Sequence, residues 1–267
     1  MNRILSAEFL YQIFALFTAF IIVHGTYVAL IRPQAQQVLT EEVARMQENP
    51  DYVAEQSIYV VLKDFEQEAC FILFFWALAV LGFKAMRVQG QQRHLEMDML
   101  GRGADILTPN DAPQIISHID QTLPEREQDY LLPRAITVGL ERFMVTRRVP
   151  DASSAAIQTL ETEAERMESE LSMIRYVGWA IPSIGFIGTV RGIGEALRQA
   201  HRAVEGDISG VTQSLGTAFN STFIALLLSI ILMFVIYQIQ RAQERLVLDT
   251  ERYCETNLVR FLRSDMA

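Results

Sequence analysis

The side chains best suited to chemistry in this sequence are small hydroxyls inside long apolar runs. In the run from Leu215 to Tyr237, an advance of about 100° per residue gathers small and hydroxyl-bearing residues on one side of a predicted helix. These residues are Ser214, Thr217, Ala218, Ser221, Thr222, Ala225 and Ser229, whereas Phe219, Phe223, Leu226, Leu227 and Ile230 fall on the other side. Because a helix surrounded by lipid has no use for a hydroxyl stripe, we expect the stripe to face protein or a hydrated path.

A second apolar run, from Val177 to Gly194, has a matching face. This face carries Pro182, Gly185, Thr189 and Gly192, with Gly188 beside them. Glycines four residues apart let another helix approach closely, and a proline inside a helix removes one backbone hydrogen bond and favours a kink. We therefore predict a helix-packing and kink role for Pro182 and the three glycines.

Arg191 is the one charged residue of this second run, close to its outer end. Two interpretations are open for it. Either Arg191 snorkels or pairs with Glu195 one turn on, or it takes part in ion access.

The two hydroxyl-bearing runs contain no Asp, Glu, Lys or His. A membrane path for protons needs a titratable group or a chain of water near mid-depth, and a hydroxyl cannot hold the charge. If these helices pass protons, a carboxylate must therefore come from a partner chain. The alternative is that Thr189 and Thr222 bond only to their own helix backbone.

Four apolar blocks predict four membrane crossings. Leu215–Tyr237 is uncharged over 23 residues, enough to span a hydrocarbon core of about 30 Å. Val177–Gly194 and Phe9–Ile31 are two further crossings, and Ala69–Phe83 is a shorter one, with Lys84 and Arg87 expected to snorkel at its end. We do not interpret the first block as a cleaved signal peptide, because Glu8 breaks the basic n-region and no small-x-small site follows promptly.

Charge predicts the orientation of these crossings. Basic residues follow the second and fourth blocks and precede the first, whereas residues 33–68 hold eight acidic residues against Arg45 and Lys63. The positive-inside rule therefore places both termini and the 84–175 segment in the cytoplasm, with 33–68 and 195–213 facing outward. In a bacterium this is a multi-pass protein of the inner membrane.

The polar segments predict two long helical extensions. After Pro150–Asp151, apolar residues recur every three or four positions up to the third crossing, at Ile157, Leu160, Ala164, Met167, Leu171 and Ile174. This seam packs either within the chain's own bundle or between copies. Residues 101–133 hold four prolines and predict short helices and loops, and the glycine- and proline-free stretch 238–262 extends the fourth helix. The fold class is thus an all-α membrane protein with four transmembrane helices and long cytoplasmic extensions of the third and fourth.

Composition excludes several classes of function. The net charge of −9 over 267 residues disfavours nucleic acid, which needs a basic face. No nucleophile–base set, phosphate loop or C-x-x-C spacing is present, so we predict no enzyme activity and no cofactor; Cys70 and Cys254 fall on opposite sides of the membrane. Asp51, Asp64, Glu66 and Glu68 are weak candidates for a hard-cation site, for example Ca²⁺, against the alternative of a solvated acidic surface.

Two sequence motifs resemble a known family. Residues 181–194 read I-P-S-I-G-F-I-G-T-V-R-G-I-G, similar to the P-x-I-G-L-x-G-T-V-x-G-I signature of the TolQ and ExbB branch of the MotA/TolQ/ExbB proton-channel family. Residues 215–225, L-G-T-A-F-N-S-T-F-I-A, resemble that branch's second element, A-L-x-x-T-x-x-G-L. The resemblance covers roughly residues 150–240. Arg191 and Ala225 depart from the family pattern, and four crossings resemble MotA rather than the three-span TolQ and ExbB.

This resemblance implies a function. Thr189 and Thr222 correspond to pore threonines that face a partner's aspartate, in an ion pathway that includes Thr217 and Ser221. The transported ion is H⁺ in preference to Na⁺. The assembly implied is a homo-oligomer, a pentamer, around a dimer of single-span MotB-, TolR- or ExbD-like partners. We expect the small-residue faces to line a central cavity between copies, with Phe219 and Phe223 turned away.

We accordingly divide the chain into six segments: the N-terminal region and first crossing 1–32, a periplasmic segment 33–68, the second crossing 69–88, a cytoplasmic helical region 89–175, the channel core 176–240 and a C-terminal helix 241–267. The predicted function is a stator-type proton-channel subunit that converts proton-motive force into mechanical work. The alternative is a structural scaffold or receptor subunit without ion conduction. Outer-membrane energisation, flagellar or gliding motility and defence remain open as the driven process.

Overall fold

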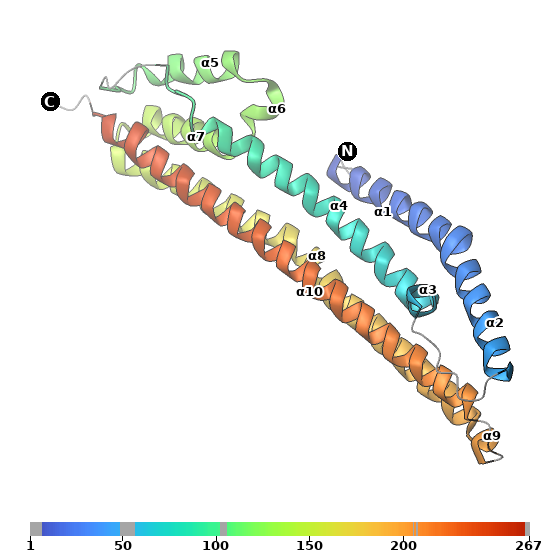
Figure 1. Cartoon of the computed structure of the whole chain (residues 1–267). Helices are drawn as coiled ribbons and strands as arrows, with labels where there is room; N and C mark the ends of the chain where they lie inside the picture. Colours follow the sequence, from blue (N-terminus) through green and yellow to red (C-terminus); the bar gives the residue numbers. More distant parts are fainter. Residues whose placement is uncertain (1–6, 49–56, 102–105, 205, 207, 265–267) are drawn as a thin grey trace, which may run out of the picture. The chain divides into compact units, whose positions relative to one another are not determined.

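The computed structural model describes residues 7–48, 57–101, 106–204, 206 and 208–264, and these are almost entirely helical (Figure 1). Four of the helices are long and apolar enough to cross a membrane. The predicted all-α fold with four crossings is therefore confirmed. In the described residues, β-structure is limited to one isolated parallel bridge between Leu107 and Leu262.

The chain forms two compact units, the first made of residues 1–81 and 173–236. Its helices are α1 (Ala7–Thr26), α2 (Arg32–Glu48), α3 (Ile58–Leu62), the start of α4 (Phe65–His94), the end of α8 (Val149–Arg198), α9 (Ala200–Val204) and the start of α10 (Ser209–Tyr253). A π-helical turn, Tyr27–Ile31, joins α1 to α2. The four apolar blocks of the sequence fall in α1 with this turn, α4, α8 and α10.

Side-chain to backbone hydrogen bonds attach α1 to α4 in this first unit. The Tyr11 hydroxyl donates to the Ala79 carbonyl at 3.1 Å, and the Trp76 indole donates to the Gln12 carbonyl at 2.9 Å. Each contact gives a hydrogen-bond acceptor to a polar group that would otherwise be unpaired within an apolar band. Helix α4 begins at Phe65, earlier than the predicted Ala69, which removes the difficulty that the second crossing looked short.

The second unit, residues 82–172 and 237–267, has its own hydrophobic core. Its helices are the end of α4, α5 (Ala112–Thr122), α6 (Glu125–Gln128), α7 (Leu131–Thr146), the start of α8, the end of α10, and the short turns Cys254–Leu258 and Val259–Phe261. Pro113 lies in the first turn of α5, and α5 ends just before Pro124, as proline placement favours. The predicted short helices of 101–133 are present.

Helix α7 supplies much of this core, with Ile136 and Phe143 fully buried. It ends at Thr146, and the next residue, Arg147, has a φ of 56°, the left-handed conformation that commonly terminates helices. The seam residues Leu160, Leu171 and Ile174 are buried against the chain's own helices, which is the first of the two alternatives for this seam, whereas Ile157 is 37% exposed. Both cysteines are free and buried.

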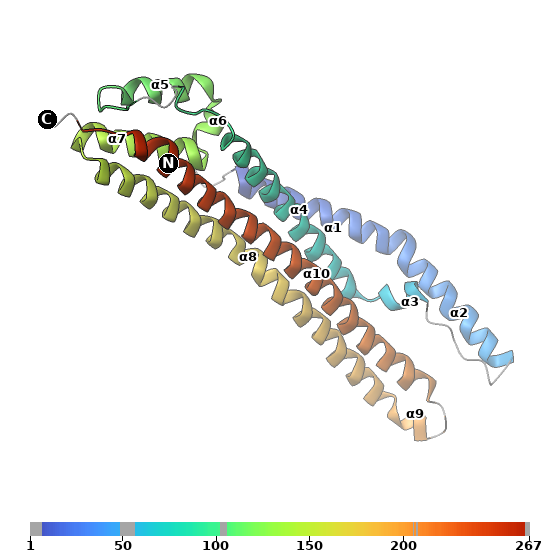
Figure 2. The ribbon, with the colours of Figure 1, turned by 60° about the vertical axis from the view of Figure 1, so that its left-hand side comes forward.

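Helices α8 and α10 are the longest elements, and they lie side by side in both views (Figures 1 and 2). Helix α8 stays α-helical through Pro182 and extends from the third apolar block back to Val149. Helix α10 extends beyond the fourth block to Tyr253. The unit boundaries at 81/82, 172/173 and 236/237 fall within α4, α8 and α10.

Candidate functional site

The small-residue faces of α8 and α10 pack directly against each other within one chain. A methyl carbon in place of a Gly188 hydrogen would lie 2.6 Å from Ser221 Cβ, and one on Gly192 would lie 2.7 Å from Ala218 Cβ. Gly185 meets Ala225 and the Ser221 carbonyl in the same way. The two backbones therefore lie closer together than larger side chains at these positions would allow.

Hydroxyl groups bridge this α8–α10 seam at its centre. Thr189 and Thr222 contact each other through their hydroxyl oxygens. Thr189 Oγ1 also donates to the Ala218 carbonyl at 3.0 Å, and Thr222 Oγ1 to the Gly185 carbonyl at 3.1 Å. Both threonines are partly exposed, so one edge of the pair is open to a further helix.

The other two predicted pathway residues lie on the same helix face of α10. The Ser221 hydroxyl is buried and donates to the Thr217 carbonyl at 3.0 Å. Thr217 itself is partly exposed. Farther along the seam, Ser229 Oγ donates to the Gly178 carbonyl at 2.9 Å.

The expectation that these small-residue faces line a cavity between copies is wrong for most of the seam. Gly185, Gly188 and Gly192 are covered by α10 of the same chain. The physical reason is that the nearest surface able to match a stripe of small residues is the second such stripe on the adjoining helix. Phe219 and Phe223, 67% and 62% exposed, point away from the seam.

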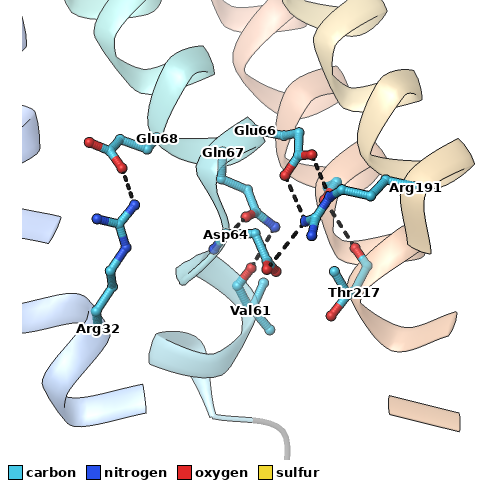
Figure 3. Close-up of polar contacts among 9 residues, drawn as sticks. Arg32, Val61, Asp64, Glu66, Gln67, Glu68, Arg191 and Thr217 are labelled. Atoms are coloured by element: carbon cyan, nitrogen blue, oxygen red, sulfur yellow. Dashed lines mark hydrogen bonds and ion pairs between the residues drawn. The ribbon is translucent and has the colours of Figure 1, made fainter. Parts of the chain in front are cut away.

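Arg191 binds two carboxylates from the start of α4 (Figure 3). Its Nε and Nη2 donate to the two oxygens of Glu66 at 2.7 and 2.8 Å, and Nη2 lies 3.4 Å from Asp64 Oδ1. The predicted pairing of Arg191 with Glu195 is wrong, because Glu195 binds Arg198 instead. A bidentate carboxylate fits the planar guanidinium better than a single helical neighbour does.

Buried amide contacts hold this acidic turn in shape. The Gln67 side chain is fully buried, accepts from the Asp64 backbone N–H at 3.0 Å and donates to the Val61 carbonyl at 2.8 Å (Figure 3). Burial raises the pKa of Asp64, an effect that the nearby Lys63 and Arg191 charges oppose. Among the described residues, Asp64 Oδ2 is buried without a hydrogen-bond partner.

Glu68, two residues after Glu66, faces the other side of α4. It is buried and pairs with Arg32 and, at 2.6 Å, with His24 Nδ1. The Arg32 guanidinium also lies 4.3 Å from the Phe65 ring centroid. The weak cation-site candidates are thus split between two arginines, and no three metal-ligating side chains meet in the part of the chain that the structure describes. Asp51 lies outside the described residues.

Lys84 departs from its expected position at the end of the second crossing. It is only 4% exposed and its Nζ lies 2.7 Å from Glu170 Oε2 on α8, so it does not snorkel to solvent. Burial on its own would raise the pKa of Glu170, but Lys84 and Arg166 reverse the effect and hold that pKa below its usual range. Lys84 and Glu170 both belong to the second unit.

Sequence reasoning missed Glu66, Gln67 and the His24–Glu68–Arg32 group as interaction partners. The pair Arg191–Glu66 joins residues 125 positions apart, beyond any local pattern. One signal was available: eight acidic residues in 33–68 were assigned to the same side of the membrane as Arg191. Charge balance on that side would have favoured a partner there over Glu195.

Residues 127–252 match the MotA/TolQ/ExbB proton channel family. The match contains both sequence motifs, α7, the whole of α8 and the whole apolar part of α10, and it confirms the resemblance. It leaves out α1 to α5 and the first half of α6. No curated protein and no solved structure matches the chain.

Proposed function

We propose that this chain, whose residues 127–252 are a MotA/TolQ/ExbB proton channel family region, is the stator-type subunit of a proton-driven membrane motor. The observation that carries the proposal is the Thr189–Thr222 hydroxyl pair within that region, open along one edge between two apolar helices. A proton crossing 100 mV releases about 2.3 kcal/mol, which the complex turns into movement of a partner.

The hydroxyl pair requires a carboxylate from another chain. Thr189 and Thr222 can donate or accept hydrogen bonds but cannot carry the proton as a stable charge. A single-span partner with an aspartate near mid-membrane, facing the open edge of the pair, would complete the path. Thr217 and Ser221 extend the polar surface along α10 toward the Arg191 end of the seam.

The proposed assembly is a pentamer of this chain around two such partner helices in a bacterial inner membrane. The large side chains of α8 and α10 that point away from the seam, among them Phe186, Ile187 and Phe223, would then meet lipid or neighbouring copies. The proposed orientation keeps both termini in the cytoplasm, because basic residues flank those ends of the crossings.

The proposal is tested by reconstitution. A single-span protein with an aspartate in its span is sought among the neighbouring genes and purified together with the chain. The two are placed in liposomes and assayed with a pH-sensitive dye under an imposed potential. We expect proton flux that is lost when the partner's aspartate is changed to Asn and that is unchanged by replacing K⁺ with Na⁺. Native mass spectrometry of the same sample gives the stoichiometry.

A second function, a scaffold or receptor subunit without conduction, is favoured by one observation. The hydroxyls of Thr189 and Thr222 contact each other, and each has a backbone carbonyl of the facing helix as an acceptor for its proton, so packing alone accounts for them. A complex that assembles with the partner and leaks no more protons than empty liposomes would establish this second function and exclude the first.

A further inference from the structure

The first turn of α4 is bonded on both of its sides. Glu66 pairs with Arg191 on α8, and Glu68 pairs with Arg32 at the start of α2 (Figure 3). Glu68 also pairs with His24 on α1. Residues 66 and 68 lie about 200° apart around the helix axis, so one turn meets both neighbours. This turn therefore joins helices outside the family-matched region to α8 inside it.

Glu66 also reaches the α8–α10 seam itself. A methyl on Gly188 would lie 3.2 Å from Glu66 Cγ as well as 2.6 Å from Ser221 Cβ, so three helices meet at this glycine. One turn further along α4, Cys70 is fully buried, with its Sγ 3.6 Å from the Ile181 carbonyl. Gly188 directly precedes Thr189, so Glu66 packs against the α8 residue adjacent in sequence to the hydroxyl pair.

The Arg191–Glu66 pair is better placed than an ordinary surface ion pair. An exposed pair is worth little because solvent screens it and two long side chains must be ordered. Here Arg191 is 49% exposed, but the Glu66 side chain is only 12% exposed and accepts two hydrogen bonds. The buried Gln67 amide fixes the turn that presents it, so the carboxylate is already ordered.

From these contacts we infer that Glu66 and Arg191 are positioning residues, which hold the Gly185–Gly192 stretch of α8 in register with α10 so that the Thr189 and Thr222 hydroxyls meet. The inference rests on the proposed function for its effect on flux. It also makes the N-terminal helices a working part of the channel: their connection to α8 sets the geometry of the hydroxyl pair.

The test combines single variants with a charge exchange in the purified complex. Glu66→Gln and Arg191→Gln should each lower proton flux per assembled complex by about fivefold or more. Exchanging the two charges, Glu66→Arg with Arg191→Glu, should restore flux to within about twofold of the parent, because a reversed pair holds the helices equally well. The exchange is made in an Asp64→Asn background, assayed alone as its reference, since Asp64 would repel a carboxylate at position 191. Glu195→Gln, which alters an exposed pair on the same helix, is the matched control and should leave flux unchanged.

Two further readouts separate positioning from a general loss of stability. With Thr222→Val present, Glu66→Gln should reduce flux little further, although the two losses in thermal midpoint add. Amide hydrogen exchange in residues 185–192 should quicken in Glu66→Gln and return to the parent rate in the charge exchange, while amides near Gly178 stay unchanged.

Several outcomes would overturn the inference. These are parent-like flux in both Gln variants, a charge exchange that assembles without recovering flux, or fully independent effects of Glu66→Gln and Thr222→Val on flux. If the parent complex itself passes no protons, the proposed function fails. The amide hydrogen-exchange measurement alone then decides the positioning role. An unaltered amide hydrogen-exchange rate in residues 185–192 of Glu66→Gln would then refute the positioning role.

Discussion

Thr189 and Thr222 lie 33 residues apart in the chain, on different helices, yet touch through their hydroxyl oxygens. This contact is possible because Gly185, Gly188 and Gly192 bring the two backbones together on either side of it. The hydroxyl pair and the glycine seam are consequently one structure. Substitutions at the two kinds of position should nevertheless have different effects.

Replacing either threonine by Val should lower proton flux while the complex still assembles. Val keeps the side-chain volume but removes the hydroxyl, so a contact of roughly 1.4 kcal/mol would be lost and flux would fall about tenfold. Flux in liposomes and co-purification with the partner measure the two effects separately. Ser229→Ala, at the Gly178 end of the same seam, should retain most of the flux. Parent-like flux in both Val variants would make the threonines packing residues.

Adding a methyl to the seam should destabilise the first unit. In Gly192→Ala the new carbon would lie 2.7 Å from Ala218 Cβ and 2.8 Å from the Ser214 carbonyl, so α10 must move, at a cost of about 1–3 kcal/mol. The thermal midpoint in detergent should fall. Gly194→Ala is the control two residues away: nothing lies within 4 Å of its new carbon, and Ala favours a helix by about 1 kcal/mol over Gly. Equal midpoints for the two variants would contradict the close approach.

Glu170 predicts acid sensitivity in the second unit. Its pKa is lowered in the folded protein, because Lys84 and Arg166 outweigh the effect of burial. A lowered carboxylate pKa stabilises the fold above the unfolded value of 4.5 and loses that contribution as pH falls through the folded pKa. Glu170→Gln should therefore lower the midpoint at pH 7 and flatten its decline below about pH 4.5. Glu168→Gln, an exposed change two residues away, should leave the midpoint and its pH dependence unchanged. If Glu170→Gln has the same acid profile as the parent, the role assigned to Glu170 is refuted.

The cation-site candidates Asp64, Glu66 and Glu68 should not bind Ca²⁺. Arg191 already neutralises Glu66 and Asp64, and Arg32 neutralises Glu68, so a divalent ion would have to displace a guanidinium from each site. Titration calorimetry of the parent with millimolar CaCl₂ should give no binding heat above dilution. Arg191→Gln, which releases two carboxylates, serves as the comparison. Saturable heat in the parent would show that the segment, including Asp51, holds a cation.

Local patterns predicted most of the helices but not the contacts between them. The apolar runs of α8 and α10 and their small-residue faces follow from the sequence, because helical periodicity acts over three to four residues. The sequence also placed Phe219 and Phe223 away from the stripe. What the two stripes pack against could not be deduced, since a face suited to close approach fits a second copy as well as the adjoining helix.

Tertiary effects account for the remaining differences. Lys84 was expected to snorkel because it follows an apolar block, but Glu170, 86 residues away, gives it a buried partner. Helix α4 starts at Phe65, four residues before the predicted crossing, and Arg191 and Arg32 neutralise the Glu66 and Glu68 charges of this additional turn. Helix α7 lies in the predicted helical region 89–175 but was not predicted as a separate helix, although it supplies much of the core of the second unit.

The glycine seam also limits which movements are open to the two channel helices. The close contacts of Gly185 with Ala225 and of Gly192 with Ala218, together with the Arg191–Glu66 pair, oppose sliding of α8 past α10, since each step would drive a methyl into backbone. Rotation of either helix about its own axis is blocked in the same way and would also break the threonine contact. In the proposed motor, a stroke powered by protons would therefore tilt the two helices together as one rigid body, and any lever action on a partner would come from that shared tilt.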